Sequence, residues 1–233
     1  MNIGDIISHH QMCNEEGTSL QRGMNYRIKP NYSIFLMSIR TGAPYADRIE
    51  DDGNTLIYEG HDIANYKTLK TSPKIIDQSE FLPNSTTLTE NGKFIQCVKN
   101  YKDKKSPAEI VKIYEKIKPG IWSFNGFFKL IDFWQEISNN RKVFKFKLEL
   151  IDFDESEADC STSLQNNHTR LIPTYVKLEV WKRDNGKCVI CGSNKNLHFD
   201  HNIPFSKGGS STTSKNIQIL CANCNLSKND KIV

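Results

Sequence analysis

Apolar residues in the first 150 positions alternate or cluster in a way that predicts β-strands. A short apolar run at Tyr32–Ile39 is typical of a buried strand, and a second strand is predicted at Thr55–Glu59, after a polar turn. Two longer strands are predicted at Ile121–Trp134, which is rich in aromatic residues, and at Val143–Leu150. In the last of these, Phe and Leu alternate with Lys and Glu, so we expect one face of that strand to be exposed to solvent.

Two segments between these strands carry apolar residues at helical spacing. The first is the stretch 90–102. The second follows a capping box at Ser106–Glu109, which has Pro at the first helical position, and runs to Pro119. Its apolar positions predict one buried helical face: Ile110, Ile113, Tyr114 and Ile117. The sequence thus predicts an α+β fold, whose N-terminal part is a curved β-sheet or small barrel with flanking helices.

A change in composition separates this part of the chain from its C-terminal region. The segment Ile151–Cys160 contains five acidic residues and no Lys or Arg, and the polar stretch after it continues to Thr169. Such a segment is typical of an exposed linker. We therefore expect an N-terminal extension at 1–20, a first domain at 21–150, a linker at 151–172 and a second domain at 173–233. The second domain begins with a predicted short helix after Pro173.

Positive charge is concentrated in the second domain. The net charge is +4, but eight Lys and Arg face three Asp and Glu after residue 180, an excess of five that leaves about −1 for the rest. A basic segment of this kind suits a phosphate backbone. The polar first residues and the lack of a long apolar run predict neither a secretory leader nor a membrane span. Cys13, Cys97 and Cys160 are far apart and odd in number, which favours free thiols in the cytoplasm.

Two Cys-x-x-Cys pairs mark the C-terminal region, Cys188 with Cys191 and Cys221 with Cys224. Each pair can hold two corners of a tetrahedral site from one tight turn, so the four thiolates suit Zn²⁺. Because four protein ligands leave no open position, such a zinc ion is structural, and catalytic groups must lie elsewhere. A zinc ribbon that only binds DNA is the alternative interpretation of the four cysteines.

Between and after the cysteine pairs the chain carries Asp200-His201, Asn216 and Asn225-x-x-Lys. In order and spacing these residues resemble the HNH family of endonucleases, also called ββα-metal nucleases, over residues 180–232. The resemblance implies that His201 is the general base and that Asn216 braces the loop carrying it. It also implies that Asp200 and Asn225, which stands in place of the last His of the motif, bind the catalytic metal ion.

The chemistry of phosphodiester hydrolysis fits these residue types. The reaction needs an activated water and a cation that neutralises charge on the phosphate and on the departing oxygen. An imidazole accepts a proton near neutral pH, and a carboxylate with an amide oxygen suits a hydrated Mg²⁺ or Mn²⁺. Asp200 and His201 would point to opposite faces of an ideal strand, so we expect the strand to end or twist there. Candidate phosphate contacts are Lys182, Lys207 and Lys228.

A second set of short motifs lies in the first domain. It comprises, in order, Gly42-Ala-Pro-Tyr-Ala-Asp47, Asp51-Asp-Gly53, Tyr58-Glu-Gly60 and Trp122-Ser-Phe-Asn-Gly-Phe-Phe128. This order resembles the SRA domain, also called YDG, although the Tyr-Asp-Gly of the family reads Phe124-Asn-Gly126 here. The resemblance implies a domain that flips a modified cytosine out of duplex DNA and holds it in a pocket.

The same resemblance implies roles for three residues of that pocket. Tyr45 and Tyr58 match the positions whose rings enclose the base, and Asp47 matches the acidic residue that accepts from the cytosine amino group. Aromatic faces and a polar partner replace the stacking and pairing that a flipped base loses. From the residues alone, core packing explains Tyr58 and a turn explains Asp47. His61 has no assigned task and is interpreted as a loop residue.

Together these patterns favour a modification-dependent restriction endonuclease, of type II with type IV-like specificity. It would flip 5-methylcytosine or 5-hydroxymethylcytosine of double-stranded DNA into the SRA-like pocket and cut the backbone with the HNH domain. Because one HNH site cuts one strand, cleavage of both strands implies a homodimer. Two alternatives remain open: an HNH endonuclease whose recognition depends on sequence or structure instead of modification, and a reader of modified DNA that does not cleave.

Overall fold

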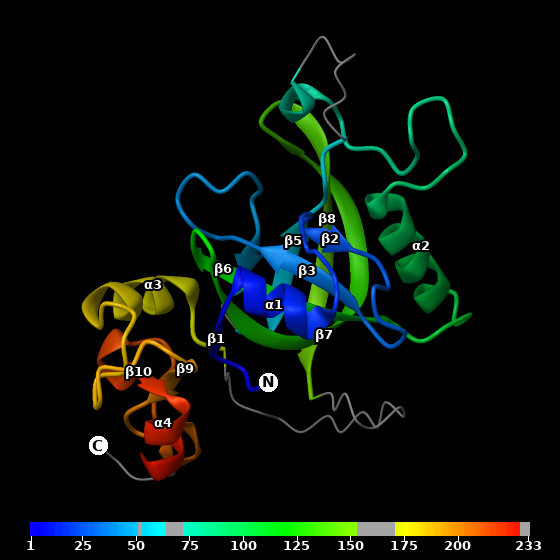
Figure 1. Cartoon of the computed structure of the whole chain (residues 1–233). Helices are drawn as coiled ribbons and strands as arrows, with labels where there is room; N and C mark the ends of the chain where they lie inside the picture. The colour runs from blue at the N-terminus through cyan, green and yellow to red at the C-terminus, as the bar shows by residue number, and fades with distance from the viewer. Residues whose placement is uncertain (51–52, 64–71, 153–170, 229–233) are drawn as a thin grey trace.

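The computed structural model describes residues 1–50, 53–63, 72–152 and 171–228, in which ten strands form one sheet with helices against its faces (Figure 1). The strands are β1 (Asp5–Ser8), β2 (Met24–Asn25), β3 (Ser33–Met37), β4 (Arg48–Ile49), β5 (Thr55–Glu59), β6 (Glu109–Lys118), β7 (Ile121–Ser138), β8 (Arg141–Ile151), β9 (Leu197–His201) and β10 (Ile217–Cys221). The helices are α1 (His9–Glu16), α2 (Glu90–Lys102), α3 (Thr174–Arg183) and α4 (Ala222–Lys228), with short 3-10 turns at Pro73–Ile75, Phe205–Lys207 and Ser214–Asn216. The predicted α+β class is confirmed.

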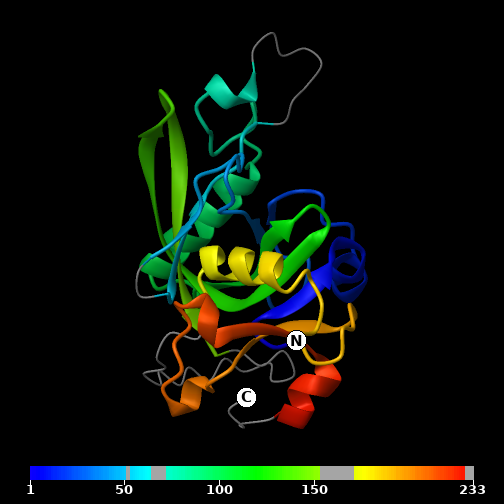
Figure 2. The ribbon, with the colours of Figure 1, turned by 90° about the vertical axis from the view of Figure 1, so that its left-hand side faces the viewer.

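The sheet branches at β7, which is 18 residues long. Its first half pairs with β1 and β6, and its second half pairs with β8. From β7 one path leads through β1 to β9 and β10, another through β6 to β3 and β2, and a third through β8 to β5 and β4. The pairing of β3 with β6 is parallel and the other pairings in the described chain are antiparallel. Figure 2 shows the resulting curvature, with the β7–β8 hairpin extending away from the rest of the sheet.

The Phe124-Asn-Gly126 motif forms a bend in β7. The register with β6 shifts there, because Ile113 pairs with Gly126 and Tyr114 pairs with Phe124. Gly126 has a φ of +99°, and a Cβ at this position would lie 3.0 Å from Ile3 Cδ1. Only glycine meets both conditions without strain, so this bulge is the physical reason for the glycine of the motif.

The helix predicted from Ser106 to Pro119 is wrong, because this segment is the central strand β6. Both faces of β6 are covered, so its apolar residues had no reason to alternate. Three polar residues of the strand are buried as well and form ion pairs: Glu109 with Arg27, Lys112 with Glu16 and Glu115 with Lys177. Charged residues that are buried in ion pairs therefore separate the apolar residues of β6, and this gives the apolar residues the spacing of a helix.

The other predicted elements of the first 150 residues are confirmed, with ends that differ by a few residues. The one correction concerns the solvent-facing side of β8, where Lys145 is 1% exposed. Its ammonium group lies 2.9 Å from Glu59 Oε2, so this lysine is a buried partner of a carboxylate and not a surface residue.

Residues 1–20 are part of the fold. They form β1, which lies between β7 and β9, and α1, which starts at a capping box of Ser8 and Gln11. Most of the expected linker lies outside the described residues, but Leu171 and Ile172 at its end are buried. The predicted helix after Pro173 is confirmed as α3. Among the described residues, no helix has both the length and the apolar character that crossing a bilayer requires.

Candidate functional site

The four predicted zinc ligands form one cluster. Cys188 and Cys191 follow α3, Cys221 ends β10, and Cys224 lies in the first turn of α4. Their sulfur atoms all lie within 4.8 Å of one another. Zinc–thiolate bonds of about 2.3 Å place the sulfurs of a tetrahedral site roughly 3.8 Å apart, so this donor set fits a zinc ion. The cluster joins the segment between α3 and β9 to the end of β10 and to the first turn of α4.

The β9–β10 hairpin presents Asp200 and His201 at its end. Asp200 Oδ2 lies 2.9 Å from the Lys228 ammonium group and 3.3 Å from Gln218 Nε2. Lys228 also donates to the His201 carbonyl oxygen at 2.5 Å. β9 ends at His201, as expected from the need to bring two neighbouring side chains to one site.

The His201 ring is held by a residue that the sequence did not indicate. Its Nε2 lies 2.9 Å from Ser211 Oγ, and Ser211 is buried. Burial lowers the pKa of the His201 imidazole, so the ring is neutral at pH 7. If Nε2 carries the proton and donates to Ser211, Nδ1 keeps a lone pair that can accept a proton. Serine occurs four times between Ser206 and Ser214, and no spacing rule distinguishes Ser211 from the others.

Asn216 braces the loop between the two strands. Its Oδ1 accepts from the Ile203 N–H at 2.8 Å, and its Nδ2 donates to the carbonyl oxygens of Ile203 at 3.2 Å and Ser210 at 3.0 Å. Gly209 lies against this brace, since a Cβ there would lie 1.8 Å from the Ile203 carbonyl oxygen. The side chain and the glycine together fix the loop that carries Ser211 and follows His201.

The remaining predicted residues of this region differ in exposure. Asn225 is half-buried in α4, and its side chain makes no hydrogen bond to the described residues, so its amide oxygen is available to a metal ion. Lys182 and Lys207 are exposed. Lys228, in contrast, is 5% exposed and engaged with Asp200, which places it inside the site and not on its surface.

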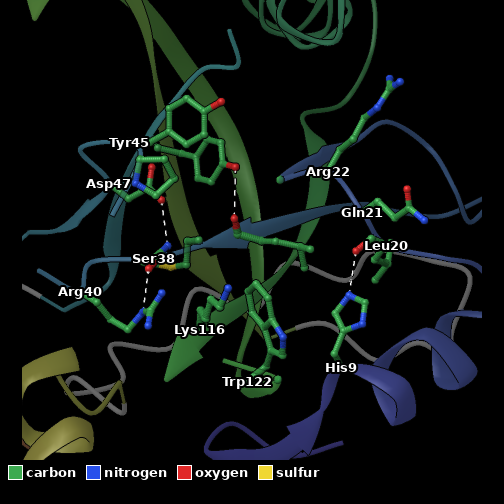
Figure 3. Close-up of a pocket in the computed structure, with 16 residues that line it drawn as sticks. His9, Leu20, Gln21, Arg22, Ser38, Arg40, Tyr45, Asp47, Lys116 and Trp122 are labelled. Atoms are coloured by element: carbon green, nitrogen blue, oxygen red, sulfur yellow. Dashed lines mark hydrogen bonds between the residues drawn. The ribbon is translucent and has the colours of Figure 1, made fainter. Parts of the chain in front are cut away.

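A cavity of about 500 Å³ lies in the first part of the chain, and the three predicted pocket residues line it (Figure 3). Asp47 is buried, with Oδ2 accepting from the Ser38 N–H at 3.0 Å and Oδ1 accepting from the Glu59 N–H at 3.0 Å. Burial raises the pKa of Asp47 to about 7, although these backbone donors act in the opposite direction. Arg22, Arg40 and Lys116 also line the cavity, which gives it a basic rim.

The two tyrosines have different surroundings. Tyr58 is 1% exposed, packs on Phe35 with ring centroids 4.4 Å apart, and donates to the Leu36 carbonyl oxygen at 3.3 Å. Tyr45 is half-buried and stacks on His61 at 5.7 Å with an interplanar angle of 19°. The structure therefore brings His61, and not Tyr58, face to face with Tyr45. The Lys74 ammonium group also lies over the Tyr45 ring, 3.8 Å from its centroid, so two residues to which the sequence assigned no task contact this ring.

A buried ion pair holds the loop that carries Tyr45 and Asp47. Glu59 Oε2 accepts from the Ala46 N–H at 3.1 Å, and the Lys145 ammonium group donates to the Ala46 carbonyl oxygen at 3.0 Å. Glu59 and Lys145 themselves lie 2.9 Å apart. Side chains of β5 and β8 thus hold both the N–H and the carbonyl oxygen of Ala46.

The C-terminal region matches a known protein family. Residues 188–231 match the family model described as HNH endonuclease. This region is an HNH endonuclease domain. The HNH domain contains the four-cysteine cluster, the Asp200-His201 pair and the Asn216 brace described above.

The chain is also similar to several solved structures, at low sequence identity. The chain is similar to the modification-dependent TagI restriction endonuclease, with 19% identity and a TM-score of 0.43, covering 98% of this chain and 78% of that chain. It is also similar to the SRA domain of SUVH5 in complex with methylated CHH DNA, with 19% identity and a TM-score of 0.44 over 65% of this chain and 89% of that chain. The SUVH5 SRA domain bound to fully hydroxymethylated CG DNA gives 20% identity and the same TM-score and coverage. No curated protein matches the chain.

Proposed function

We propose that this protein is a modification-dependent DNA endonuclease, which binds a modified cytosine in the Tyr45–Asp47 cavity and cuts the same duplex with the HNH domain. The observation that carries this proposal is the cavity itself. Its volume of about 500 Å³ lies within the range of ligand sites, and it presents an aromatic ring beside a buried carboxylate. A flipped cytosine needs these two groups, one for its ring and one for its amino group.

The HNH domain supplies groups for the hydrolytic step. Nδ1 of the neutral His201 imidazole would take the proton from the attacking water, while Ser211 on Nε2 keeps the ring oriented. Asp200 and Asn225 would hold a hydrated Mg²⁺ or Mn²⁺ ion, which supplies positive charge at the phosphate and at the departing oxygen. Hydrolysis with this arrangement would leave 5′-phosphate and 3′-hydroxyl ends. Lys207 of this domain and Lys182 of α3 are exposed and would contact flanking phosphates.

Two copies of the chain would act together on a double strand. One HNH centre hydrolyses one strand, so cutting of both strands needs a second centre in a symmetric or sequential arrangement. We propose a homodimer on the DNA for this reason.

Binding of the modified duplex should strengthen between pH 6 and pH 8. The pKa of Asp47 is raised to about 7, so the fraction of carboxylate rises from about one tenth to about nine tenths across this range, up to a tenfold gain in affinity. The measurement is fluorescence anisotropy of duplexes with one 5-methylcytosine, 5-hydroxymethylcytosine or cytosine, bound by a His201→Ala variant that leaves the DNA intact.

Two variants separate the pocket from general DNA affinity. Asp47→Asn should lose the pH dependence, and Tyr45→Ala should lose the preference for the modified duplex. Equal affinity of the unaltered pocket for all three duplexes at every pH would contradict the proposed base recognition.

A further inference from the structure

The HNH domain and the base cavity share one sheet, and β1 is the strand that joins them. Ile6 pairs with Ser123 of β7 on one side and with Leu197 of β9 on the other. The neighbouring backbone continues this ladder, since the Gly4 N–H donates to the Phe124 carbonyl oxygen at 2.9 Å and the Phe199 N–H donates to the Gly4 carbonyl oxygen at 3.0 Å. Hydrogen bonds therefore run without a break from β6 and β7 into the nuclease hairpin.

The side chains of β1 pack into two different apolar clusters. Ile6 packs against an apolar cluster that joins Val176 of α3 and Ile219 of β10 to Ile117 of β6. Ile7 belongs to a cluster of the first part of the chain, together with Tyr114. Leu171 and Ile172, just before α3, are divided in the same way. Leu171 belongs to the core cluster of the first part of the chain, and Ile172 belongs to the cluster that contains Val176 and Ile219.

A buried polar cluster forms a second junction, between α3 and the sheet. The Lys177 ammonium group lies 2.8 Å from Glu115 Oε2 of β6 and donates to Asn125 Oδ1 of β7 at 2.6 Å. Asn125 Nδ2 donates to Glu115 Oε2 at 3.0 Å, and the Thr174 hydroxyl donates to Glu115 Oε1. The side chains of Glu115 and Lys177 are 0% and 1% exposed, so this cluster is closed to water.

Buried ion pairs of this kind fix geometry more than they add stability. A charge pair removed from water holds one arrangement, because any sliding of α3 along β6 would leave a buried charge without its partner. Figure 2 shows α3 lying along the sheet beside the nuclease hairpin. The asparagine of the Phe124-Asn-Gly126 motif thus has a task at this junction, separate from the cavity.

We infer that Glu115, Asn125 and Lys177, together with β1, are positioning residues that hold the HNH centre at one fixed distance from the base cavity, and so determine which phosphodiester bond is cut. This inference rests on the proposed function, since the flipped base is the reference point of the distance. The inference therefore predicts that the length of the covalent connection ahead of Leu171 does not set this distance.

The cut position tests this inference. Duplexes with one modified cytosine, labelled at either 5′ end, are digested and the products resolved at single-nucleotide resolution. The unaltered protein should place most cuts at one bond of each strand. Lys177→Met should spread them over several neighbouring bonds and lower the share of the main product at least several-fold.

A matched control lies on the same strand. Lys112 of β6 forms an equally buried ion pair with Glu16, 3.0 Å apart, but both residues belong to the first part of the chain. Lys112→Met should reduce stability as Lys177→Met does, yet leave the cut position unchanged. A spread of cuts in both variants would show that general loosening, and not the junction, moves the cut.

A second variant decides the matter if Lys177→Met does not fold. Ten Gly and Ser residues inserted after Cys160 lengthen the covalent connection and leave β1 and the Lys177 cluster intact. The cut position should not move, and a shift or spread would overturn the inference. If the unaltered protein cuts modified and unmodified DNA alike, the proposed function fails instead. Cuts only in modified DNA but at scattered distances would contradict the inference alone.

Discussion

Replacing His201 with alanine should lower the rate of DNA cleavage by at least two orders of magnitude while zinc content and DNA affinity stay unchanged. A general base contributes about 10²- to 10⁴-fold to a hydrolytic rate, and the loss here should lie in that range. His201 is half-buried and contacts Ser211 and the ring of Phe205, so its removal leaves the zinc cluster and the strand pairing intact. The measurement is the single-turnover rate of cleavage of a modified duplex with Mg²⁺ or Mn²⁺.

His198 provides the matched control for this substitution. It lies on the same strand, three residues earlier, and its Nδ1 pairs with Asp5 of β1. His198→Ala should lower stability modestly and keep the cleavage rate within a few-fold of the unaltered protein. Undiminished cutting by His201→Ala, or equal loss in both variants, would remove His201 from the role of general base.

Replacing Cys221 with serine should release zinc and destroy the HNH domain. Structural zinc sites contribute on the order of 10 kcal/mol of folding free energy in small domains, comparable with the whole stability of a typical domain. Cys221 joins β10 to α4, and α4 carries Asn225 and Lys228, so loss of the metal separates the catalytic residues from the hairpin. The measurement combines zinc content per chain with thermal unfolding and cleavage.

Two other cysteines serve as controls for the zinc experiment. Cys13 and Cys97 lie outside the four-thiol cluster. Cys13→Ser and Cys97→Ser should each retain one zinc ion per chain and the full cleavage rate. Retention of one zinc ion and of activity by Cys221→Ser would contradict the assignment of the cluster as a structural site.

The grouping of the four cysteines could be predicted because the Cys-x-x-Cys spacing places two metal ligands in one tight turn. A Cys-x-x-Cys pair makes one tight turn, and the structure brings the two pairs together as expected. Asn216 was predicted to brace a loop and makes three hydrogen bonds to it. Ser211 was not predicted, because a single hydroxyl that orients an imidazole leaves no pattern in the chain.

The error at β6 has a different cause. Local signals, a capping box and apolar residues at i, i+3, i+4 and i+7, favoured a helix, but a strand covered on both faces obeys no periodicity. The buried Lys112 and Glu115 of this strand have their ion-pair partners on α1 and α3. Partners so far away in sequence cannot be found by inspecting a window of residues.

Long-range contacts also explain what was missed at the cavity and at the N-terminus. The stacking of His61 on Tyr45 joins a loop to the end of a strand, and a family motif that names Tyr45 and Tyr58 gives no sign of it. The first residues looked polar and separate, yet Ile6 and Ile7 each complete a different apolar cluster. Two isoleucines in a polar segment carry little signal until the strand beside them is known.

The most direct test of the account is a digest of one duplex in three forms, with cytosine, 5-methylcytosine or 5-hydroxymethylcytosine at a single position, in Mg²⁺ or Mn²⁺. We predict cutting of one or both modified forms, none of the unmodified form, and a rate lower by at least two orders of magnitude for His201→Ala. Equal cutting of all three forms would contradict the coupling of a modified-base cavity to the HNH domain, and would leave Tyr45 and Asp47 as structural residues of a nuclease that recognises DNA in another way.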